Sequence, residues 1–107
     1  RGIEKDFLKA NGWFVKAALR NHIQSQHILG SLYQHGEGGM KQDYNKAYKW
    51  YFKAAIQGHA DSQCELSNLL YHGYGNIQQD KVKAREWCIA AGKQGHAKAQ
   101  KVLNKYF

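Results

Sequence analysis

The sequence predicts an all-α fold, an α/α solenoid (superhelix) of stacked helical hairpins with about six helices. Three observations predict it. Trp13, Trp50 and Trp87 are spaced 37 residues apart, which is the signature of an internal repeat. Apolar and small residues recur at steps of three and four residues instead of alternating, which favours helices over strands. Glycine-bearing breaks at 36–39 and 73–75 interrupt this pattern one repeat apart.

The repeat is in register along the whole chain, and no gap is needed to align the copies. The step that separates the tryptophans also links Asp6, Asp43 and Asp80; Lys9, Lys46 and Lys83; Ala10, Ala47 and Ala84; Ala17, Ala54 and Ala91; His22, His59 and His96; Gln26, Gln63 and Gln100; and Leu29, Leu66 and Leu103. We therefore divide a single domain, 1–107, into copies at 6–42 and 43–79 and a partial copy at 80–107.

Each copy contains two helical stretches of different type. The predicted helices cover about 5–20, 23–35, 43–57, 60–72, 80–94 and 97–106. In the stretch 43–57, Asp43 is a natural N-cap, and Ala47, Trp50, Tyr51 and Ala54 share one face. Gly58 ends that stretch.

The stretch 60–72 carries the second type of helix. One stripe of it is made by Ala60, Gln63, Leu66, Leu69 and Leu70. The chain thus opens with the second helix of a repeat and closes with the first helix of another. Either these half-repeats cover two complete units, or the chain comes from a longer array. Exposed terminal helices can also pair, so a monomer and a homodimer through them both stay open.

The chain is strongly basic. Its 107 residues include 16 Lys and Arg against 8 Asp and Glu, a formal net charge of +8, which favours acidic partners. Lys93, Lys98, Lys101 and Lys105 follow Trp87 with no acid among them, so we expect a positive C-terminal end. No apolar run approaches the length of a membrane span. The compartment is not readable, and bacterial periplasm and cytoplasm stay open. Because the chain begins with Arg rather than Met, we expect that an upstream segment with any address was removed.

The histidines and the glycine-rich loop invite cofactor hypotheses, and we expect neither a metal nor another cofactor. Repeat position explains five of the six histidines as helix-end residues, and metal binding needs ligands that converge on one site. The segment 36–41 lacks the spacing of a phosphate-binding loop and follows a helix. The tryptophans, beside small alanines, are expected in the core.

Cys64 and Cys88 flank a loop centred near residue 76, so an antiparallel hairpin places them at similar height. A disulfide is therefore geometrically conceivable, but two free thiols are favoured. Cys88 stands where earlier copies have Phe14 and Tyr51.

The segments 29–38 and 42–60 carry a family resemblance: LGSLYQHGEG, then QDYNKAYKWYFKAAIQGHA. This pattern resembles the Sel1-like repeat, a relative of the tetratricopeptide repeat, and the resemblance covers nearly the whole chain from Asp6. The second copy departs from the pattern at Ser67 and Leu70, where the family prefers Gly and Tyr. The resemblance implies a scaffold, or adaptor, that binds other proteins and has no catalytic role.

The resemblance also implies a groove lined by the first helix of each hairpin. Read by register, its residues are Gln24, His27, Ser31, Gln34, His35, Asp61, Cys64, Asn68, Tyr71, His72, Lys98, Lys101 and Lys105. Such a polar, partly cationic surface suits an extended or helical acidic segment, with Tyr71 as its aromatic anchor. His27 and Ser31 occupy positions where some tetratricopeptide domains clamp a terminal carboxylate, so recognition of a free C-terminus is not expected.

The predicted function is therefore non-enzymatic protein or peptide binding, with no small-molecule substrate. One form of it is an inhibitor or immunity-type protein that covers an acidic cleft. The alternative is binding of nucleic acid or another polyanion through the lysine-rich face, against which arginine is scarce. A hydrolase is disfavoured because the sequence offers no convergent acid, base and nucleophile.

Overall fold

The computed structural model describes residues 12–107 and confirms the predicted all-α fold. After a helical stretch over residues 12–19, the helices are α2 (Ile23–His35), α3 (Tyr44–Ala55), α4 (Ala60–His72), α5 (Lys81–Lys93) and α6 (Ala97–Tyr106). No strand occurs within the described range. The bounds of these helices differ from the predicted ones by two residues at most. The first part of the first predicted helix, with Asp6, Lys9 and Ala10, lies outside the described residues.

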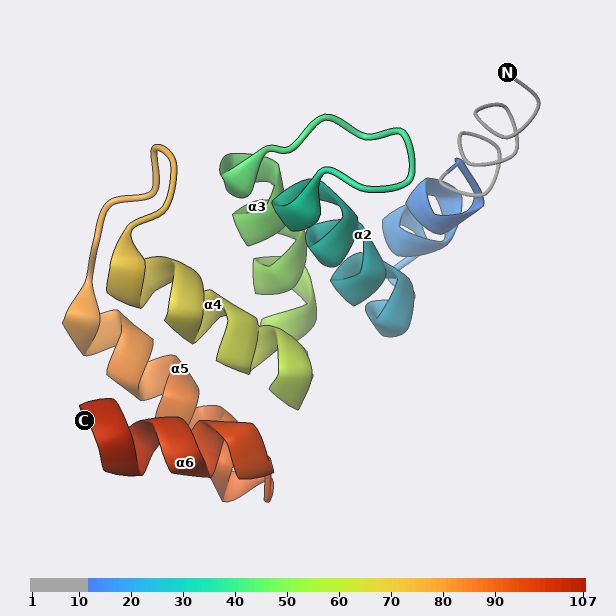
Figure 1. Cartoon of the computed structure of the whole chain (residues 1–107). Coiled ribbons are helices and arrows are strands. Elements are labelled where there is room, and N and C mark those ends of the chain that lie inside the picture. Colours follow the sequence, from blue (N-terminus) through green and yellow to red (C-terminus); the bar gives the residue numbers. More distant parts are fainter. Residues whose placement is uncertain (1–11) are drawn as a thin grey trace.

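Successive helices stack as hairpins along one axis, so the molecule is elongated, 46 × 25 × 19 Å. α2 packs against α3, α3 against α4, α4 against α5, and α5 against α6. The loops that join α2 to α3 and α4 to α5 leave the stack on the same edge (Figure 1). Every second helix, α2, α4 and α6, therefore belongs to one row.

Each row of helices has its own N-terminal cap. His22, His59 and His96 precede α2, α4 and α6, and the side chain of each accepts a hydrogen bond from a backbone N–H three residues on. Asp43 and Asp80 do the same at α3 and α5. These side chains satisfy donors that the first helical turn leaves free, which explains why both residue types recur at the repeat step.

Glycine is required where α2 and α4 end. Gly36 and Gly73 both have a φ of 67°, and their N–H groups bond to the carbonyl oxygens of Leu32 and Leu69. Other L-residues avoid this left-handed conformation, so glycine ends both helices at the same place.

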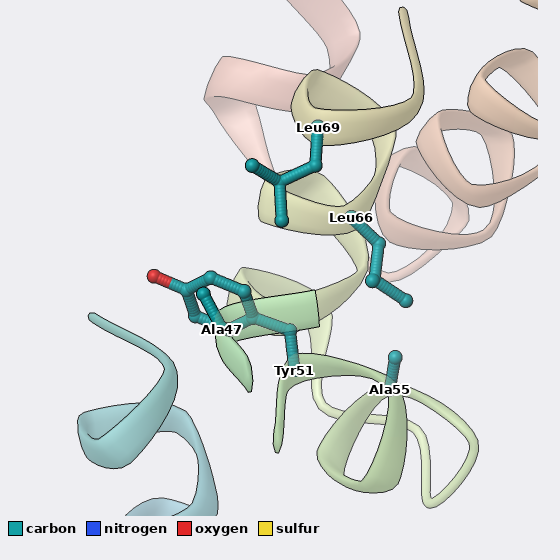
Figure 2. Packing of buried hydrophobic residues seen from close by; sticks show 5 residues of the cluster. All are labelled: Ala47, Tyr51, Ala55, Leu66 and Leu69. Atoms are coloured by element: carbon teal, nitrogen blue, oxygen red, sulfur yellow. The ribbon is translucent and has the colours of Figure 1, made fainter. Parts of the chain in front are cut away.

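The central core lies between α3 and α4. It contains Ala47, Tyr51, Ala55, Leu66 and Leu69, all of them at most 1% exposed (Figure 2). The Tyr51 ring points from α3 toward α2, where its hydroxyl donates to Gln34 Oε1 over 2.7 Å.

The Tyr51 ring fits only because α2 has a glycine beside it. A Cβ at Gly30 would lie 2.6 Å from the Tyr51 ring carbons, well inside van der Waals contact. The pair Gly30 and Tyr51 thus forms one packing unit, a large ring over an empty Cβ position.

Buried glutamines link each hairpin to the next. Gln63, at the start of α4, donates from Nε2 to the Ala55 carbonyl oxygen (3.1 Å) and accepts at Oε1 from Gln94 Nε2 (3.0 Å). Gln26 makes the equivalent bonds one repeat earlier, to the Ala18 carbonyl oxygen (3.1 Å) and from Gln57 (2.9 Å). Both glutamines are at most 5% exposed, so these bonds satisfy amides that would be costly to bury alone.

The tryptophan prediction is correct for one position and wrong for another. Trp50 is 8% exposed and packs with Ala18 and Leu29, and Trp87 is half-buried against the core. Trp13, however, is 64% exposed. The residues of this helical stretch that pack with Leu29 and Trp50 are Phe14, Val15 and Ala18.

We expect Trp50→Ala to lower the free energy of unfolding by about 3–5 kcal/mol, because it leaves a cavity between hairpins. Trp13→Ala, the same change at the same repeat position on the surface, should cost less than about 1 kcal/mol. Urea unfolding followed by circular dichroism measures both. Equal losses for the two variants would contradict this assignment of the core.

Candidate functional site

The structure places the thirteen predicted groove residues on α2, α4 and α6, at different depths. Exposed members are Gln24, His35, Asp61, Asn68, His72, Lys98, Lys101 and Lys105; half-buried members are His27, Ser31, Gln34 and Tyr71; Cys64 is buried. The groove as a binding surface stays a prediction. Its members divide into those that hold the helices together and those that remain available.

Several of these polar side chains join neighbouring helices of the row. Between α2 and α4, which we call the first joint, Ser62 bonds to His27 Nδ1 (2.8 Å) and His59 Nε2 bonds to Gln24 (3.2 Å). Between α4 and α6, the second joint, His96 Nε2 bonds to Asp61 Oδ1 over 2.6 Å. His27, Gln24 and Asp61 are therefore structural contacts as well as candidate groove residues.

The hydrogen bonds of the first joint order its protons. His59 Nδ1 accepts from the Ser62 backbone N–H (3.2 Å), so that nitrogen carries no proton and also accepts from the Ser62 hydroxyl (2.9 Å). The hydroxyl oxygen is then left to accept from His27 Nδ1–H. The His27 ring packs between those of His59 and Tyr51, with centroids 4.9 and 5.3 Å away. In this arrangement His27 acts as a donor from Nδ1.

Burial is the main reason that the pKa of His27 lies below its ordinary value, and repulsion from His59 lowers it further. Asp61 acts in the opposite direction and raises it. His27 is the one histidine that repeat position does not explain, because Cys64 stands at the equivalent place in the next copy. This departure from the repeat was visible in the sequence, but the role of His27 between the helices was not.

The folded chain should lose stability as the pH falls below about 6.5, because the unfolded state then binds more protons at His27 than the folded state does. His27 stays partly exposed, so the loss is below the limit of about 1.4 kcal/mol per pH unit that one proton sets. Urea unfolding between pH 7.5 and 5.5 measures the slope. His27→Gln should flatten it and the exposed His35→Gln should not; the same slope in all three proteins would contradict the assignment.

A pocket of about 130 Å³ opens at the second joint, and it brings part of the predicted groove together. Cys64, Asn68, Tyr71, His72 and Lys98 line it, as the groove prediction would place them. Its remaining lining, which the sequence reasoning did not include, is Ser67, Val102, Tyr106 and Phe107. The signal for the last two was the aromatic pair that ends the chain.

Aromatic rings form one wall of this pocket. The Tyr71 ring lies 5.6 Å from the centroids of both Tyr106 and Phe107. Ammonium groups sit over these rings, Lys81 Nζ 5.1 Å from the Tyr71 centroid and Lys105 Nζ 5.2 Å from that of Tyr106. The pocket therefore combines an apolar interior with a cationic rim.

The cysteines are free thiols, as the sequence favoured, and they belong to one buried cluster with Ala91 and Ala99. Burial raises the pKa of the Cys64 thiol to about 11 and also raises that of Cys88. The Cys88 thiol donates to the Ala99 carbonyl oxygen over 3.2 Å. Neither environment activates a thiolate, so both cysteines act as packing residues.

Both thiols should react slowly with Ellman's reagent at pH 8 in the folded protein, because a pKa of about 11 leaves roughly one Cys64 in a thousand as thiolate. Full reaction of two thiols is expected in guanidinium chloride. Rapid labelling of the folded chain would contradict the buried placement, and Cys64→Ala shows which thiol reacted.

The remaining histidines serve the helix ends. His35 and His72 donate from Nδ1 to carbonyl oxygens one turn back, those of Ser31 (3.0 Å) and Asn68 (3.3 Å). Among residues 12–107, no three His, Cys, Asp or Glu side chains are grouped so that they could hold a metal ion. Nor does a helix in that range have the length and apolar character to cross a membrane.

The Sel1 repeat family model matches residues 1–22, 23–59 and 60–96. Among solved structures, a Sel1 repeat protein from Oxalobacter formigenes is 32% identical, with a TM-score of 0.85 over 92% of this chain and 38% of that one. The c5321 protein, a protective antigen of uropathogenic Escherichia coli with an SLR fold, is 28% identical, with a TM-score of 0.83 over 87% of this chain and 20% of that one.

This chain therefore spans well under half the length of either structure. A search of curated proteins found no match. Sel1 repeat proteins generally mediate protein–protein interaction and are typically non-enzymatic scaffolds. The family model covers most of the sequence with the same 37-residue step that the tryptophans keep, and the chain belongs to the Sel1 repeat family.

Proposed function

We propose that this chain is a non-enzymatic scaffold that binds a partner protein or peptide along the row formed by α2, α4 and α6. The observation that carries the proposal is that some side chains of this row join the helices while others remain accessible. Histidine and serine side chains hold the helices side by side, while Asn68, Tyr71 and the α6 lysines stay accessible. The titratable side chains with shifted pKa values, such as His27 and Cys64, are used in packing and in joints, which supports a role without catalysis.

The charge of the row favours an acidic partner. Lys98, Lys101 and Lys105 are exposed on α6, and Lys98 pairs with Glu65 over a loose 3.7 Å. Exposed lysines of one sign accelerate association with an oppositely charged surface and add modestly to affinity. The finer form of the proposal is an inhibitor or immunity-type protein, which requires a tight complex of one chain with one partner.

The test is affinity capture from the source organism's lysate at low and high salt. The wild-type bait should recover one dominant protein, and Tyr71→Ala/Lys98→Glu/Lys101→Glu should recover at least about tenfold less of it. The matched control is Trp13→Ala/Lys16→Glu/Lys49→Glu, which removes an exposed aromatic ring and the same charge away from the row.

Two outcomes would overturn the proposal, and a third would exclude only its inhibitor form. If the row variant and the control variant recover equal amounts of the partner protein, the binding site lies elsewhere. Recovery of nucleic acid that falls steeply with salt, at a slope set by the phosphates contacted, assigns the lysines to a polyanion instead. Capture of many proteins in micromolar complexes excludes the inhibitor form.

A further inference from the structure

Comparison of the two joints explains why the pocket exists where it does. In the first joint, the Tyr51 ring fills the space over Gly30, beside His27 and Gln34. One repeat later, the residues at the positions of Tyr51, Gly30, His27 and Gln34 are Cys88, Ser67, Cys64 and Tyr71.

Tyr51, the largest of these four side chains, is thus replaced by Cys88 in the second repeat. Cys88 is fully buried at the floor of the joint, with the Ser67 hydroxyl close to its thiol. Ser67, Cys64 and Tyr71, the counterparts of the residues around the Tyr51 ring, line the pocket. Cys88 itself does not line the pocket, but Ser67 and Cys64 beside it do, so the pocket lies next to the position from which the first repeat projects an aromatic ring.

The size and lining of this space select its occupant. Its volume is about 130 Å³, and an apolar cavity of about 150 Å³ in a protein core holds a benzene ring. Val102, Tyr106 and Phe107 close it on the α6 side. One phenyl or branched aliphatic side chain fits.

The rim selects acidic neighbours for that side chain. Lys98 lines the pocket, and Lys81 and Lys105 hold their ammonium groups over its rings. No Asp or Glu is among the described residues that line the pocket, and Lys98 on its rim pairs with Glu65 at 3.7 Å. The Asn68 side chain lies exposed in the lining, and its amide offers both a donor and an acceptor to a peptide backbone.

We propose that this pocket between α4 and α6 is the anchor site for a partner peptide, and that it takes one Phe- or Leu-sized side chain flanked by Asp or Glu. The inference rests on the proposed function and deepens it: the row supplies contact area and charge, and the pocket supplies the buried anchor. The first joint offers no equivalent site because Tyr51 already occupies it.

The probe is a short capped, fluorescein-labelled peptide with one Phe between acidic residues. Two companion peptides replace Phe by Ser, or Asp and Glu by Asn and Gln. We expect fluorescence anisotropy to show binding of the first peptide and at least about tenfold weaker binding of each companion. Amide shifts in nuclear magnetic resonance spectra should locate the contact at Asn68, Tyr71 and Val102.

The decisive variant fills the pocket from within. Ser67→Gly/Cys88→Tyr recreates in the second joint the glycine and tyrosine of the first, and should abolish peptide binding without any change of charge. A melting temperature at or above that of the wild type shows that the ring is accommodated. Tyr71→Gln, which installs the residue of the first repeat, removes the aromatic wall by a milder change and should weaken binding at least about tenfold. Lys49→Gln, a change outside the pocket, is the control and should leave peptide binding unchanged.

The inference is overturned if the filled variant binds the Phe peptide as well as the wild type does, or if the Ser peptide binds equally well. It is also overturned if a wild-type dimer buries the pocket, which makes a second copy the occupant. If the filled variant still captures the protein partner from lysate, the proposed function stands and the pocket is not its anchor. If neither capture nor peptide binding occurs, both fail.

Discussion

The rest of the structure depends on a buried glutamine that ties each hairpin to the next. Gln63 bonds to the Ala55 carbonyl at the end of the preceding hairpin's second helix and accepts from Gln94 at the end of its own hairpin. Gln26 repeats the arrangement one step earlier. Because an amide has both a donor and an acceptor group, one side chain can fix three segments at once, and a buried amide without these partners would be costly. Regular spacing of the hairpins, and with it the row of α2, α4 and α6, follows from this contact.

Most of the fold could be predicted from the sequence because local and repeated signals agree. Asp43 and His59 mark helix starts, Gly36 and Gly73 mark helix ends, and the alanine and leucine faces recur at helical steps. Two discrepancies have physical causes. Trp13 has the repeat position of a core residue but is exposed, because Phe14, Val15 and Ala18 of the same helical stretch are the residues that pack with Leu29 and Trp50. α3 ends at Ala55, ahead of Gly58, because the N–H groups of Gln57 and Gly58 bond to the carbonyl oxygens three residues back, in a turn tighter than the helix.

The candidate site was only partly predictable, because it depends on contacts between repeats and not within them. Register placed Tyr71 on α4 and Lys98 on α6, and both line the pocket. It did not show that His27 would turn into the first joint, nor that the last two residues would close a pocket. The substitutions that create this pocket, Cys88 and Ser67, are visible in the sequence as departures from the repeat. Their combined effect cannot be predicted without knowing that the two positions face each other across α4 and α5.

These departures explain how a repetitive chain can carry a localised site. Where the repeat is kept, as in the ring of Tyr51 over Gly30, side chains fill the joint and stabilise the stack. Where it is broken, the joint loses packing and gains a cavity, which costs stability locally unless a ligand fills it. Affinity in protein interfaces concentrates in a few buried anchors and does not scale with contact area. A row of solvated lysines and glutamines can therefore steer a partner, while specificity requires a feature that the other repeats do not share. In this chain, Cys88 in place of a tyrosine provides that feature.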